Sequence, residues 1–389
     1  MATATTSEPA AGLNAGPEAR IDLAALRHNL GVVRAHAPAS RVWAVIKADA
    51  YGHGAGRAAA VLADADGFAL ARVHEALALR RVGVHKPLLV LEGFADADEL
   101  SAAVVAGLAL AVHDPWQIEL LEHRLGRLPP TPPLALWLKV DTGMGRLGLQ
   151  PGQTAAAVAR LRRLEPSVRL AGLMTHLANA DDPEHPLTAV QCGTARRLAG
   201  EHGLPLSIGN SAGILAHAAA RTDWVRPGIM LYGATPMLNA TAEALGLRPV
   251  MTLTSRLIAV RRLERGAAVG YGSTFVCPEA MTVGVVAIGY ADGYPRHAPP
   301  GTPVLVHGRR APLIGRVSMD MVTIDLRGVP EAAAGDVVTL WGEGLPVEEI
   351  AARVGTINYE LLCRLSPRVR VVHLDADGDG GDRAAAGPA

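Results

Sequence analysis

Short apolar runs alternate with segments of helical spacing from about residue 20 to about residue 235. Eight such runs occur, and they are RVWAVIKA (41–48), GFALA (67–71), PLLVLEG (87–93), LALAV (108–112), LALWLKV (134–140), RLAGLMTHL (169–177), PLSIGN (205–210) and RPGIMLYG (226–233). In the segments between them, such as VHEALALRRVG and TAAAVARLRRL, apolar residues recur every three or four positions, which indicates one buried helix face. Runs that are apolar throughout are typical of strands buried on both sides in a parallel sheet. Eight strand–helix units over about 215 residues therefore predict a (β/α)8 barrel, with an open doubly wound sheet as the alternative.

The pattern of apolar and polar residues changes after about residue 245. β-branched runs separated by Gly, Pro and Asp dominate it, namely MTLTSRLIAVRRL, TVGVVAIGYADG, TPVLVHGRRAPLIG, MVTIDL, GDVVTLWG and RVRVVHL. Only PVEEIAARVG and NYELLCRL have helical spacing. The predicted fold class is therefore α/β, with an N-terminal (β/α)8 TIM barrel and a C-terminal mainly β domain. We expect the barrel at 16–245, the β domain at 246–374, and disordered ends at 1–15 and 375–389.

The net charge and the length of the apolar runs argue against binding to nucleic acid and against insertion into a membrane. Lys and Arg total 37, as do Asp and Glu, so the formal net charge is +0 and nothing in the overall charge favours nucleic acid or an anionic membrane. No apolar run approaches the roughly 18 residues of a membrane helix. The first residues also lack the apolar core of a secretion signal. These features predict a soluble cytoplasmic protein.

Neither the cysteines nor the acidic tail predicts a metal site. Cys192, Cys277 and Cys363 are far apart and form no CxxC pair, which argues against a disulfide framework and a zinc site. The tail DADGDGG (375–381) begins like a calcium loop. Its twelfth position is Ala386, where such a loop needs a bidentate Glu, so disorder is the better interpretation.

Side chains that could take part in catalysis stand at the ends of several apolar runs. In a barrel, the active site lies at these C-terminal strand ends. Lys47 ends the first run, where an amine in a desolvated mouth has a lowered pKa and can form a Schiff base. A lysine that snorkels from the barrel rim is the structural alternative. Lys139 ends the fifth run, and His176 ends the sixth, where a structural role is as reasonable as a functional one.

The glycine-rich segment DTGMGRLG (141–148) admits two interpretations. Gly143, Gly145 and Gly148 spell GxGxxG after a strand, which would suit a dinucleotide. The motif does not open a βαβ domain, however. Arg146 within it can instead clamp a substrate carboxylate with two hydrogen bonds.

The last two strand ends carry groups suited to a phosphate. Asn210 and Ser211 stand where a helix begins, and Arg226, Gly228 and Ile229 follow the start of the eighth unit. Loops after strands seven and eight are the usual phosphate site of such a barrel, although a plain helix cap also explains Ser211 alone. A lysine at the first strand together with this cradle suggests pyridoxal phosphate.

Nine segments, in order from about residue 16 to 374, together resemble the alanine racemase family. They are AVIKADAYGHG (44–54), KVDTGMGRLG (139–148), MTHLA (174–178), NSAG (210–213), RPGIMLYG (226–233), GYGSTF (270–275), GYADGYPR (289–296), GRVSMDM (315–321) and TINYELLCR (356–364). The resemblance implies a fold-type III pyridoxal-phosphate enzyme, built from a barrel and a β domain, that forms a homodimer with shared active sites. It also implies interconversion of L-alanine and D-alanine, with D-alanine supplied for peptidoglycan.

The resemblance further implies roles for matching residues at the cofactor. Lys47 would hold the cofactor covalently and act as one of two bases. The phosphate would be bound by Tyr51, Asn210, Ser211, Gly228, Ile229 and Tyr359. His176 would lie against the cofactor ring, and Arg226 would face its pyridine nitrogen.

For the substrate, the resemblance implies contributions from both subunits. Arg146 would hold the substrate carboxylate or the cofactor's phenolic oxygen, and Lys139 matches a lysine that can be carbamylated to orient that arginine. The other subunit would supply Tyr271 as the second base. It would also supply the pocket residues Ser318, Met319 and Asp320, with Tyr290 and Arg296 in the entrance region. Many members have Cys where this chain has Ser318, a departure that bears on inhibitor and substrate-size preference.

Racemisation explains why two bases are needed. The α-proton leaves from one face and returns on the other, so Lys47 and Tyr271 should flank the α-carbon. A tyrosine has an ordinary pKa near 10. It needs positive charge nearby to act as a base, and we expect an arginine in its vicinity. An always-charged Arg226 would leave the pyridine nitrogen unprotonated, which disfavours transamination.

Three other functions stay open on the sequence. The first is another fold-type III enzyme, either a racemase for serine or a basic amino acid or a decarboxylase. The second is a nucleotide-binding dehydrogenase that uses the glycines of 143–148. The third is a non-catalytic pyridoxal-phosphate-binding protein, against which the β domain with Tyr271 argues.

Overall fold

The computed structural model describes residues 16–125 and 132–375, which fall into two compact units. One unit holds residues 21–251 and 373–375, and the other holds residues 16–20 and 252–372. The ends that we expected to be disordered lie outside the described residues, except for Asp375. The domain boundary expected between residues 245 and 246 stays a prediction.

Eight parallel strands close into a barrel in the first unit, in the order β2-β3-β4-β5-β6-β7-β8-β9. Their bounds are β2 (Arg41–Val45), β3 (Gly67–Leu70), β4 (Leu88–Val90), β5 (Ala109–Val112), β6 (Leu134–Lys139), β7 (Val168–Met174), β8 (Leu206–Ser207) and β9 (Trp224–Val225). The β2–β9 pairing of Arg41 with Trp224 and Val42 with Val225 closes the ring. The predicted barrel is therefore confirmed, and the open sheet is wrong.

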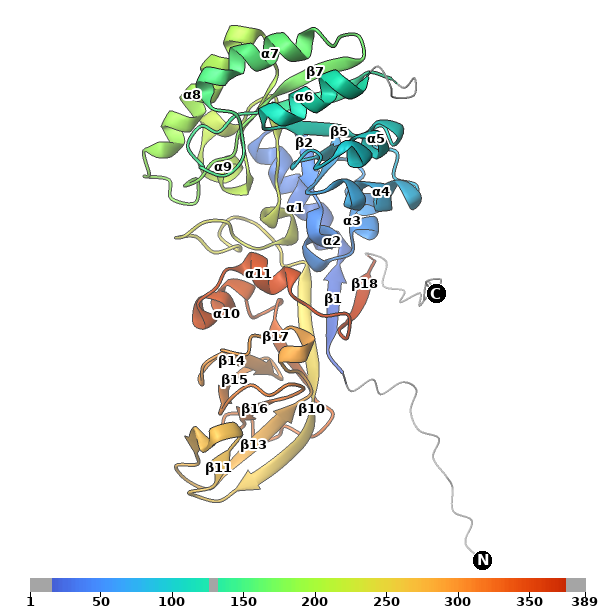
Figure 1. The fold of residues 1–389 in the computed structure, drawn as a ribbon. Coiled ribbons are helices and arrows are strands. Elements are labelled where there is room, and N and C mark those ends of the chain that lie inside the picture. Colours follow the sequence, from blue (N-terminus) through green and yellow to red (C-terminus); the bar gives the residue numbers. More distant parts are fainter. Residues whose placement is uncertain (1–15, 126–131, 376–389) are drawn as a thin grey trace, which may run out of the picture. The chain divides into compact units, whose positions relative to one another are not determined.

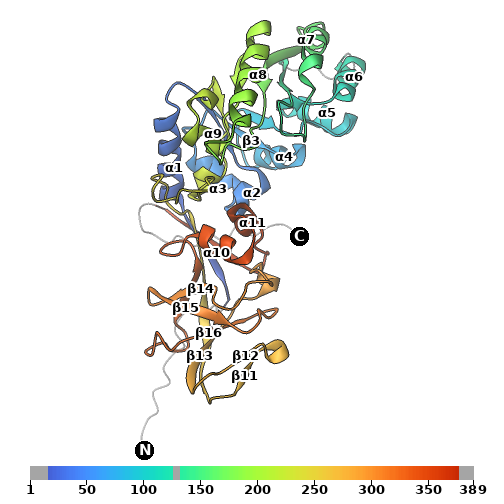
Figure 2. The same ribbon diagram turned by 90° about the vertical axis from the view of Figure 1, so that its left-hand side faces the viewer.

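Helices cover the outside of these strands, as Figures 1 and 2 show for α4 to α8. Their bounds are α1 (Leu23–His36), α3 (Ala55–Val61), α4 (Val73–Arg81), α5 (Ala97–Val105), α6 (Pro115–Arg124), α7 (Thr154–Arg162), α8 (Leu187–His202) and α9 (Ser211–Ala216). Local sequence starts several of them. Asp96 caps α5 by accepting from two backbone N–H groups, and Asp114 caps α6 just before Pro115.

The eighth strand lies earlier than the sequence predicted. We expected the run 226–233 to contain it, but the strand is Trp224–Val225, and Ile229–Tyr232 form the 3-10 helix η4. Arg226 and Pro227 still bond the neighbouring segments, because the N–H of Arg226 donates to the carbonyl of Gly209 and the carbonyl of Pro227 accepts from the N–H of Val45. Pro227 has no N–H of its own to continue the ladder. The run 226–233 is thus the loop that follows the eighth strand.

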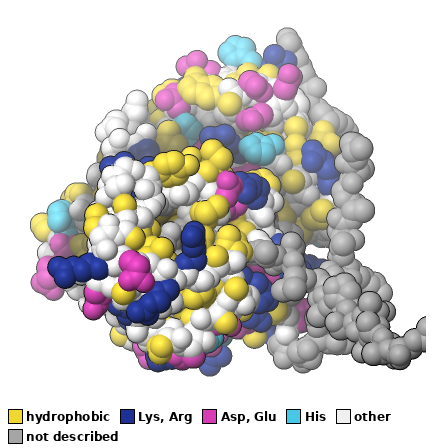
Figure 3. Space-filling view, turned by 90° about the horizontal axis from the view of Figure 1, so that it is seen from below, with side chains coloured by type: hydrophobic (Ala, Val, Ile, Leu, Met, Phe, Trp, Pro, Cys, Tyr) yellow, Lys and Arg dark blue, Asp and Glu magenta, His cyan; other side chains and the backbone are white. Residues whose placement is uncertain are grey.

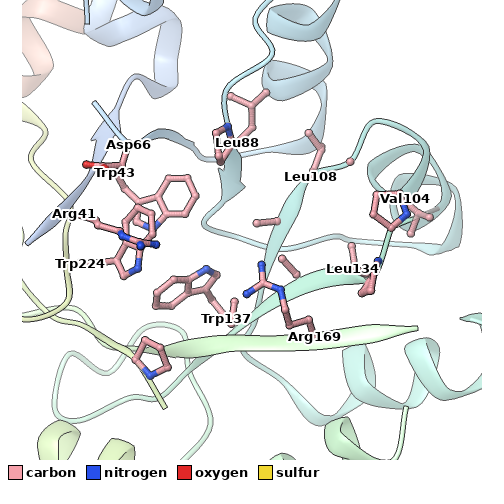
Figure 4. A pocket seen from close by; sticks show the side chains of 18 of the residues that line it. Arg41, Trp43, Asp66, Leu88, Val104, Leu108, Leu134, Trp137, Arg169 and Trp224 are labelled. Carbon is pink, nitrogen blue, oxygen red and sulfur yellow. The ribbon is translucent and has the colours of Figure 1, made fainter. Parts of the chain in front are cut away.

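Three indoles pack against one another, from the middle of β2 and of β6 and from the start of β9. Trp43 stacks on Trp224 with ring centroids 4.5 Å apart, and Trp137 meets both rings edge-on at 6.5 and 6.0 Å. Beside them opens a cavity of about 680 Å³. Figure 4 shows Arg41 next to Trp224, and Arg169 near Trp137.

Mainly β structure makes up the second unit, as predicted. One sheet has the order β13-β16-β15-β14-β17-β10-β1-β18, and β11 pairs with β12 separately. The bounds are β1 (Glu18–Asp22), β10 (Met251–Leu263), β11 (Ala268–Val269), β12 (Phe275–Val276), β13 (Met281–Val286), β14 (Pro303–Val306), β15 (Arg309–Ile314), β16 (Val322–Asp325), β17 (Val337–Trp341) and β18 (Arg370–Leu374). The two helical segments form α10 (Val347–Val354) and α11 (Asn358–Cys363). β1, which lies in the range expected for the barrel, belongs to this sheet instead.

Charges of both signs are interspersed over the face that Figure 3 shows, in line with the balanced composition. Within residues 16–125 and 132–375, no helix has both the length and the apolar character needed to cross a membrane.

Candidate active site

Lys47 begins a turn of rare backbone conformation directly after β2. The four residues from Ala48 to Tyr51 have φ values between 51° and 54°, all in the left-handed region and none of them glycine. The element α2 (Lys47–Gly52) is therefore a left-handed turn. Such backbone costs L-amino acids roughly 1–2 kcal/mol per residue, so surrounding contacts must hold it.

Two carboxylates fix the ends of this turn. Glu75, in the first turn of α4, accepts from the N–H of Ala48 at 2.7 Å, and its other oxygen accepts from the N–H groups of Ala71 and Arg72 at 2.9 and 3.0 Å. Asp49 accepts from the N–H of Ala55 at 2.7 Å, where α3 begins. The turn is thereby tied to both neighbouring helices. Sequence reasoning missed Glu75, which follows Ala48 by 27 residues and matches no motif.

The far end of the turn brings the Tyr51 hydroxyl to the predicted phosphate cradle. A Cβ on Gly228 would lie 2.6 Å from that hydroxyl oxygen, so only glycine fits there without displacing it. Ser211 Oγ accepts from the N–H of Gly228 at 2.9 Å, and Asn210 caps α9. The N–H of Ile229 opens η4 and has no acceptor in its own helix. Hydroxyl and N–H groups thus converge in the way a phosphate requires.

Four cationic side chains share the barrel mouth. Lys47, Lys139, Arg146 and Arg226 all lie close enough to lower the pKa of His176 by charge repulsion, although burial is the largest cause and holds it well below the usual value. Burial also lowers the pKa of Lys139 to about 8, assisted by Arg226 and Arg146. The ring of His176 is therefore neutral at pH 7, and the lysine amine is unusually easy to deprotonate.

Carboxylates only partly balance these cations. Glu92 raises the pKa of Lys139 against the other effects, and Asp141 also interacts with it. Glu92 is itself shared with Arg72, at 3.6 Å. The mouth therefore keeps an excess of positive charge, which favours an anionic ligand.

Arg226 is buried, and no carboxylate pairs with it among the described residues. Its guanidinium donates to Ser207 Oγ and to the backbone carbonyls of Thr175 and Ile208. Burial lowers its pKa to about 10, so the group stays charged at neutral pH. The strand ends of β7 and β8 thus hold a rigid cation in the mouth.

The glycine loop 141–148 is organised around its own aspartate. Asp141 Oδ1 accepts from the N–H groups of Gly143, Met144 and Gly145 at 2.9, 2.8 and 3.1 Å. Those N–H groups are the ones a dinucleotide phosphate would need. The loop instead presents Arg146, which is exposed and has no ion pair among the described residues. The dehydrogenase interpretation therefore loses its site, and an Asp two residues before the first glycine was the signal in the sequence.

Tyr271 lies in the second unit, at the start of the short helix η5 (Tyr271–Ser273), and is 68% exposed. A Cβ on Gly272 would lie 3.2 Å from a guanidinium nitrogen of Arg316. Arg316 thus lies beside the turn that Tyr271 begins, and the expectation of an arginine that helps Tyr271 act as a base stays a prediction.

Two loops of the second unit interlock and bring together four further candidates. Tyr290 donates its N–H to the carbonyl of Ser318 at 3.1 Å, and the next N–H donates to the carbonyl of Met319 at 2.9 Å. Arg368 pairs with Asp320 at 2.8 Å. Arg296, an exposed residue, and Tyr359, on α11, lie on other segments of this unit.

Two family models match most of the chain. The family described as alanine racemase, N-terminal domain, matches residues 21–236, and alanine racemase, C-terminal domain, matches residues 250–373. This chain belongs to the alanine racemase family. Like the relatives that carry this name, it is an enzyme of the isomerase class.

Individual members of the family align over nearly their full length. The alanine racemase of Nitrosococcus oceani is 53% identical over 353 residues, which is 91% of this chain and 98% of that protein. That of Coxiella burnetii is 46% identical over 362 residues, 92% and 98% of the two chains. Among solved structures, the biosynthetic alanine racemase of Pseudomonas aeruginosa is 44% identical with a TM-score of 0.86, over 92% and 99% of the chains. A structure described as alanine racemase from Bartonella henselae with covalently bound pyridoxal phosphate is 28% identical, with a TM-score of 0.83 over 92% and 100%.

Gly228→Ala tests the close approach of Tyr51 to the cradle. The added Cβ meets the hydroxyl, so we expect the free energy of unfolding to fall by about 1–3 kcal/mol. In a Tyr51→Phe background the loss should be smaller, because the opposing oxygen is gone. Chemical denaturation of the four chains measures this coupling, and Gly152→Ala, with nothing within 4 Å, is the matched control. Equal losses in both backgrounds would contradict the contact.

Proposed function

We propose that this chain is a pyridoxal-phosphate-dependent alanine racemase that interconverts L-alanine and D-alanine as a homodimer. The observation that carries the proposal is the convergence of Lys47, excess positive charge and the phosphate cradle at one end of the barrel. A cofactor with a phosphate and a substrate with a carboxylate are anions that suit this mouth. The cofactor named for the Bartonella henselae structure supports the same choice.

The donor set fits this cofactor group by group. The hydroxyls of Tyr51 and Ser211 and the N–H groups of Gly228 and Ile229 would bind the phosphate, and Asn210 would order the helix start beside it. The Gly228 N–H would exchange its hydrogen bond to the neutral Ser211 Oγ for one to the charged phosphate. Tyr359 would complete this phosphate site. The neutral ring of His176 would lie against the cofactor ring. The guanidinium of Arg226 would donate to the pyridine nitrogen.

The chemistry then divides between cofactor and protein. When bound, pyridoxal phosphate supplies an electron-withdrawing system that makes the α-proton of alanine acidic. The amine of Lys47 removes or returns that proton on one face, and the phenolic oxygen of Tyr271 from the second chain does so on the other. Arg146 holds the substrate carboxylate with two hydrogen bonds. Because Arg226 keeps its proton at neutral pH, it cannot protonate the pyridine nitrogen, which limits transamination.

A homodimer would bring the two bases together. Tyr271 and Met319 are 68% and 52% exposed on the single chain, and a two-fold interface would cover them. Ser318, Met319 and Asp320 would then line the substrate pocket of the other chain, with Tyr290 and Arg296 at its entrance.

Lys139 is proposed to be carbamylated, which would reverse its charge. Its neutral amine would attack carbon dioxide and release a proton, and the resulting carbamate would pair with Arg146. The lowered pKa supports this step, because the amine is about half neutral at pH 8. An ordinary lysine with a pKa near 10.4 is only about 0.4% neutral there.

The biological role that we propose is the supply of D-alanine for peptidoglycan in the cytoplasm, on the basis of the family. Alanine itself is proposed as the substrate, and Ser318 is the pocket residue that departs from many members. Racemisation rates for alanine, serine, lysine and arginine, with carbon dioxide release measured in parallel, separate this proposal from the related enzymes.

The covalent anchor is tested by borohydride reduction of the cofactor-loaded protein. The chain has only three lysines, Lys47, Lys86 and Lys139, and Lys86 donates to the carbonyl of Ala65 away from the mouth. Reduction should fix the cofactor on Lys47, and peptide mapping by mass spectrometry should find it there. A label on Lys139 or Lys86 would refute the assignment.

Mixing two inactive chains tests the shared site. A Lys47→Ala chain and a Tyr271→Phe chain each lose one base, so each homodimer should be nearly inactive. In a mixed dimer one site receives both defects and the other neither. Random reassortment makes half of the dimers mixed, so about a quarter of the wild-type site activity should return. No recovery under verified subunit exchange would mean that each site is built from one chain.

Carbamylation should depend on pH in a defined direction. The pKa of Lys139 is about 8, so at lower pH its amine is increasingly protonated and cannot react. A carbamate signal from 13C-labelled bicarbonate should therefore weaken as the pH falls from 8 to 6. NMR spectroscopy of the full-length protein measures it. The signal should vanish in Lys139→Gln and persist in Lys86→Arg. A signal that survives Lys139→Gln would disprove the site.

A further inference from the structure

His53 lies inside the turn that carries Lys47, and no step above uses it. Its side chain is 1% exposed, and Nδ1 lies 3.0 Å from the carbonyl oxygen of Ala50 and 2.9 Å from that of Tyr51. Carbonyl oxygens only accept hydrogen bonds, so Nδ1 must carry the hydrogen. Nε2 is buried and has no hydrogen-bond partner among the described residues.

Both acceptors belong to the left-handed residues. The N–H of His53 also donates to the carbonyl of Ala50, at 3.1 Å, so main chain and side chain close the turn together. Glu75 and Asp49 hold the outside of the turn through N–H groups, whereas His53 holds its inside through carbonyl groups. It is the side chain that satisfies these two acceptors from within the core.

Aromatic packing connects His53 to the strand that precedes Lys47. The imidazole lies tilted against the ring of Tyr232 at a centroid distance of 4.7 Å, and Tyr232 stacks on Tyr51 at 4.6 Å. The hydroxyl of Tyr232 donates to the carbonyl of Val45, the last residue of β2, at 2.8 Å. A displacement of His53 therefore reaches Tyr51 both through its carbonyl and through its ring.

We propose that His53 is a positioning residue, whose Nδ1–H holds the turn from Ala48 to Tyr51 in its left-handed form. The turn in this form sets the Lys47 amine at one end and the Tyr51 hydroxyl, beside Gly228, at the other. The consequence for the cofactor rests on the proposed function, while the consequence for the turn does not.

The burial of His53 supports a role through hydrogen bonds alone. Burial is the main cause that lowers the pKa of this histidine to about 4. The ring is therefore neutral at neutral pH and keeps the tautomer that the two carbonyl groups require. It neither takes up nor gives up the substrate's proton.

Two substitutions separate the hydrogen bonds from packing, because leucine roughly keeps the volume of the ring without its donor and the smaller asparagine keeps the donor without the ring. His53→Asn keeps a donor nitrogen at the position of Nδ1, and His53→Leu replaces it with a methyl group. His53→Gln, which moves the donor one bond further out, is a third variant should the leucine chain fail to fold. His36→Leu is the matched control, because the Nδ1 of His36 also bonds a carbonyl, that of Val32, at the end of α1.

The first measurement is hydrogen exchange on the cofactor-free protein. In His53→Leu and His53→Gln we expect the N–H groups of Ala50, Gly54 and Ala55 to exchange at least tenfold faster than in wild type, since loss of two hydrogen bonds loosens the turn. Amides of β6 should be unchanged. His53→Asn and His36→Leu should exchange at the wild-type rate. Unchanged exchange in the leucine and glutamine variants would overturn the proposal.

The second measurement is the affinity of the cofactor-free protein for pyridoxal phosphate, followed by kcat and KM of the loaded enzyme. We expect His53→Leu to bind the cofactor about tenfold more weakly or worse and to lower kcat more than it changes KM for alanine, and His53→Asn to restore most of both. Equal losses in the asparagine and leucine variants would assign the effect to ring packing and reject the role of Nδ1. A wild-type protein that binds no pyridoxal phosphate would contradict the proposed function, and the exchange rates would still decide the role of His53 in the turn.

Discussion

Uncompensated positive charge at the mouth of the barrel is the constraint on which the rest of the site depends. Like charges that are partly withdrawn from water repel one another and disfavour their own charged forms. Burial is the main cause that lowers the pKa values of Lys139 and His176, and repulsion from the neighbouring cations lowers them further. The same charge that destabilises the protein by itself stabilises an anion bound among these groups. The fold must therefore hold each cation rigidly, because a flexible cluster would relax apart.

Different elements provide that rigidity. Strand β6 ends on Lys139, and the ends of β7 and β8 hold Arg226 through hydroxyl and carbonyl groups. Asp141 folds the loop of Arg146 around its own carboxylate, and Glu75 ties the Lys47 turn to α4. Backbone strain at Ala48–Tyr51 is thus stored next to the residue proposed to anchor the cofactor, where the carboxylates of Glu75 and Asp49 accept hydrogen bonds that hold the turn. The left-handed turn at Lys47 and the cluster of cations at the barrel mouth therefore belong to the same site.

The sequence could predict the barrel, the β domain and the residues at the strand ends, because hydrophobic periodicity records which positions are buried. Lys47 and Lys139 close apolar runs and Arg226 opens one, so these positions needed no tertiary information. The left-handed turn was not predictable, since no glycine marks Ala48–Tyr51 and its stabilising partner Glu75 is distant in the chain. The GxGxxG pattern pointed to a dinucleotide because sequence spacing does not show which acceptor the N–H groups face, and here that acceptor is Asp141. The eighth strand was misplaced because an apolar run also describes a buried loop with a 3-10 turn.

The claim that this charge serves a phosphate-bearing cofactor is tested most directly by the stability of the cofactor-free protein. Its free energy of unfolding would be measured by chemical denaturation at fixed ionic strength, with pyridoxal phosphate or with pyridoxal at equal concentration. We predict that pyridoxal phosphate stabilises the protein by about 2.7 kcal/mol at a concentration 100 times its Kd. Pyridoxal, which lacks the phosphate, should stabilise the protein far less. Equal stabilisation by the two compounds, or none by either, would contradict the account.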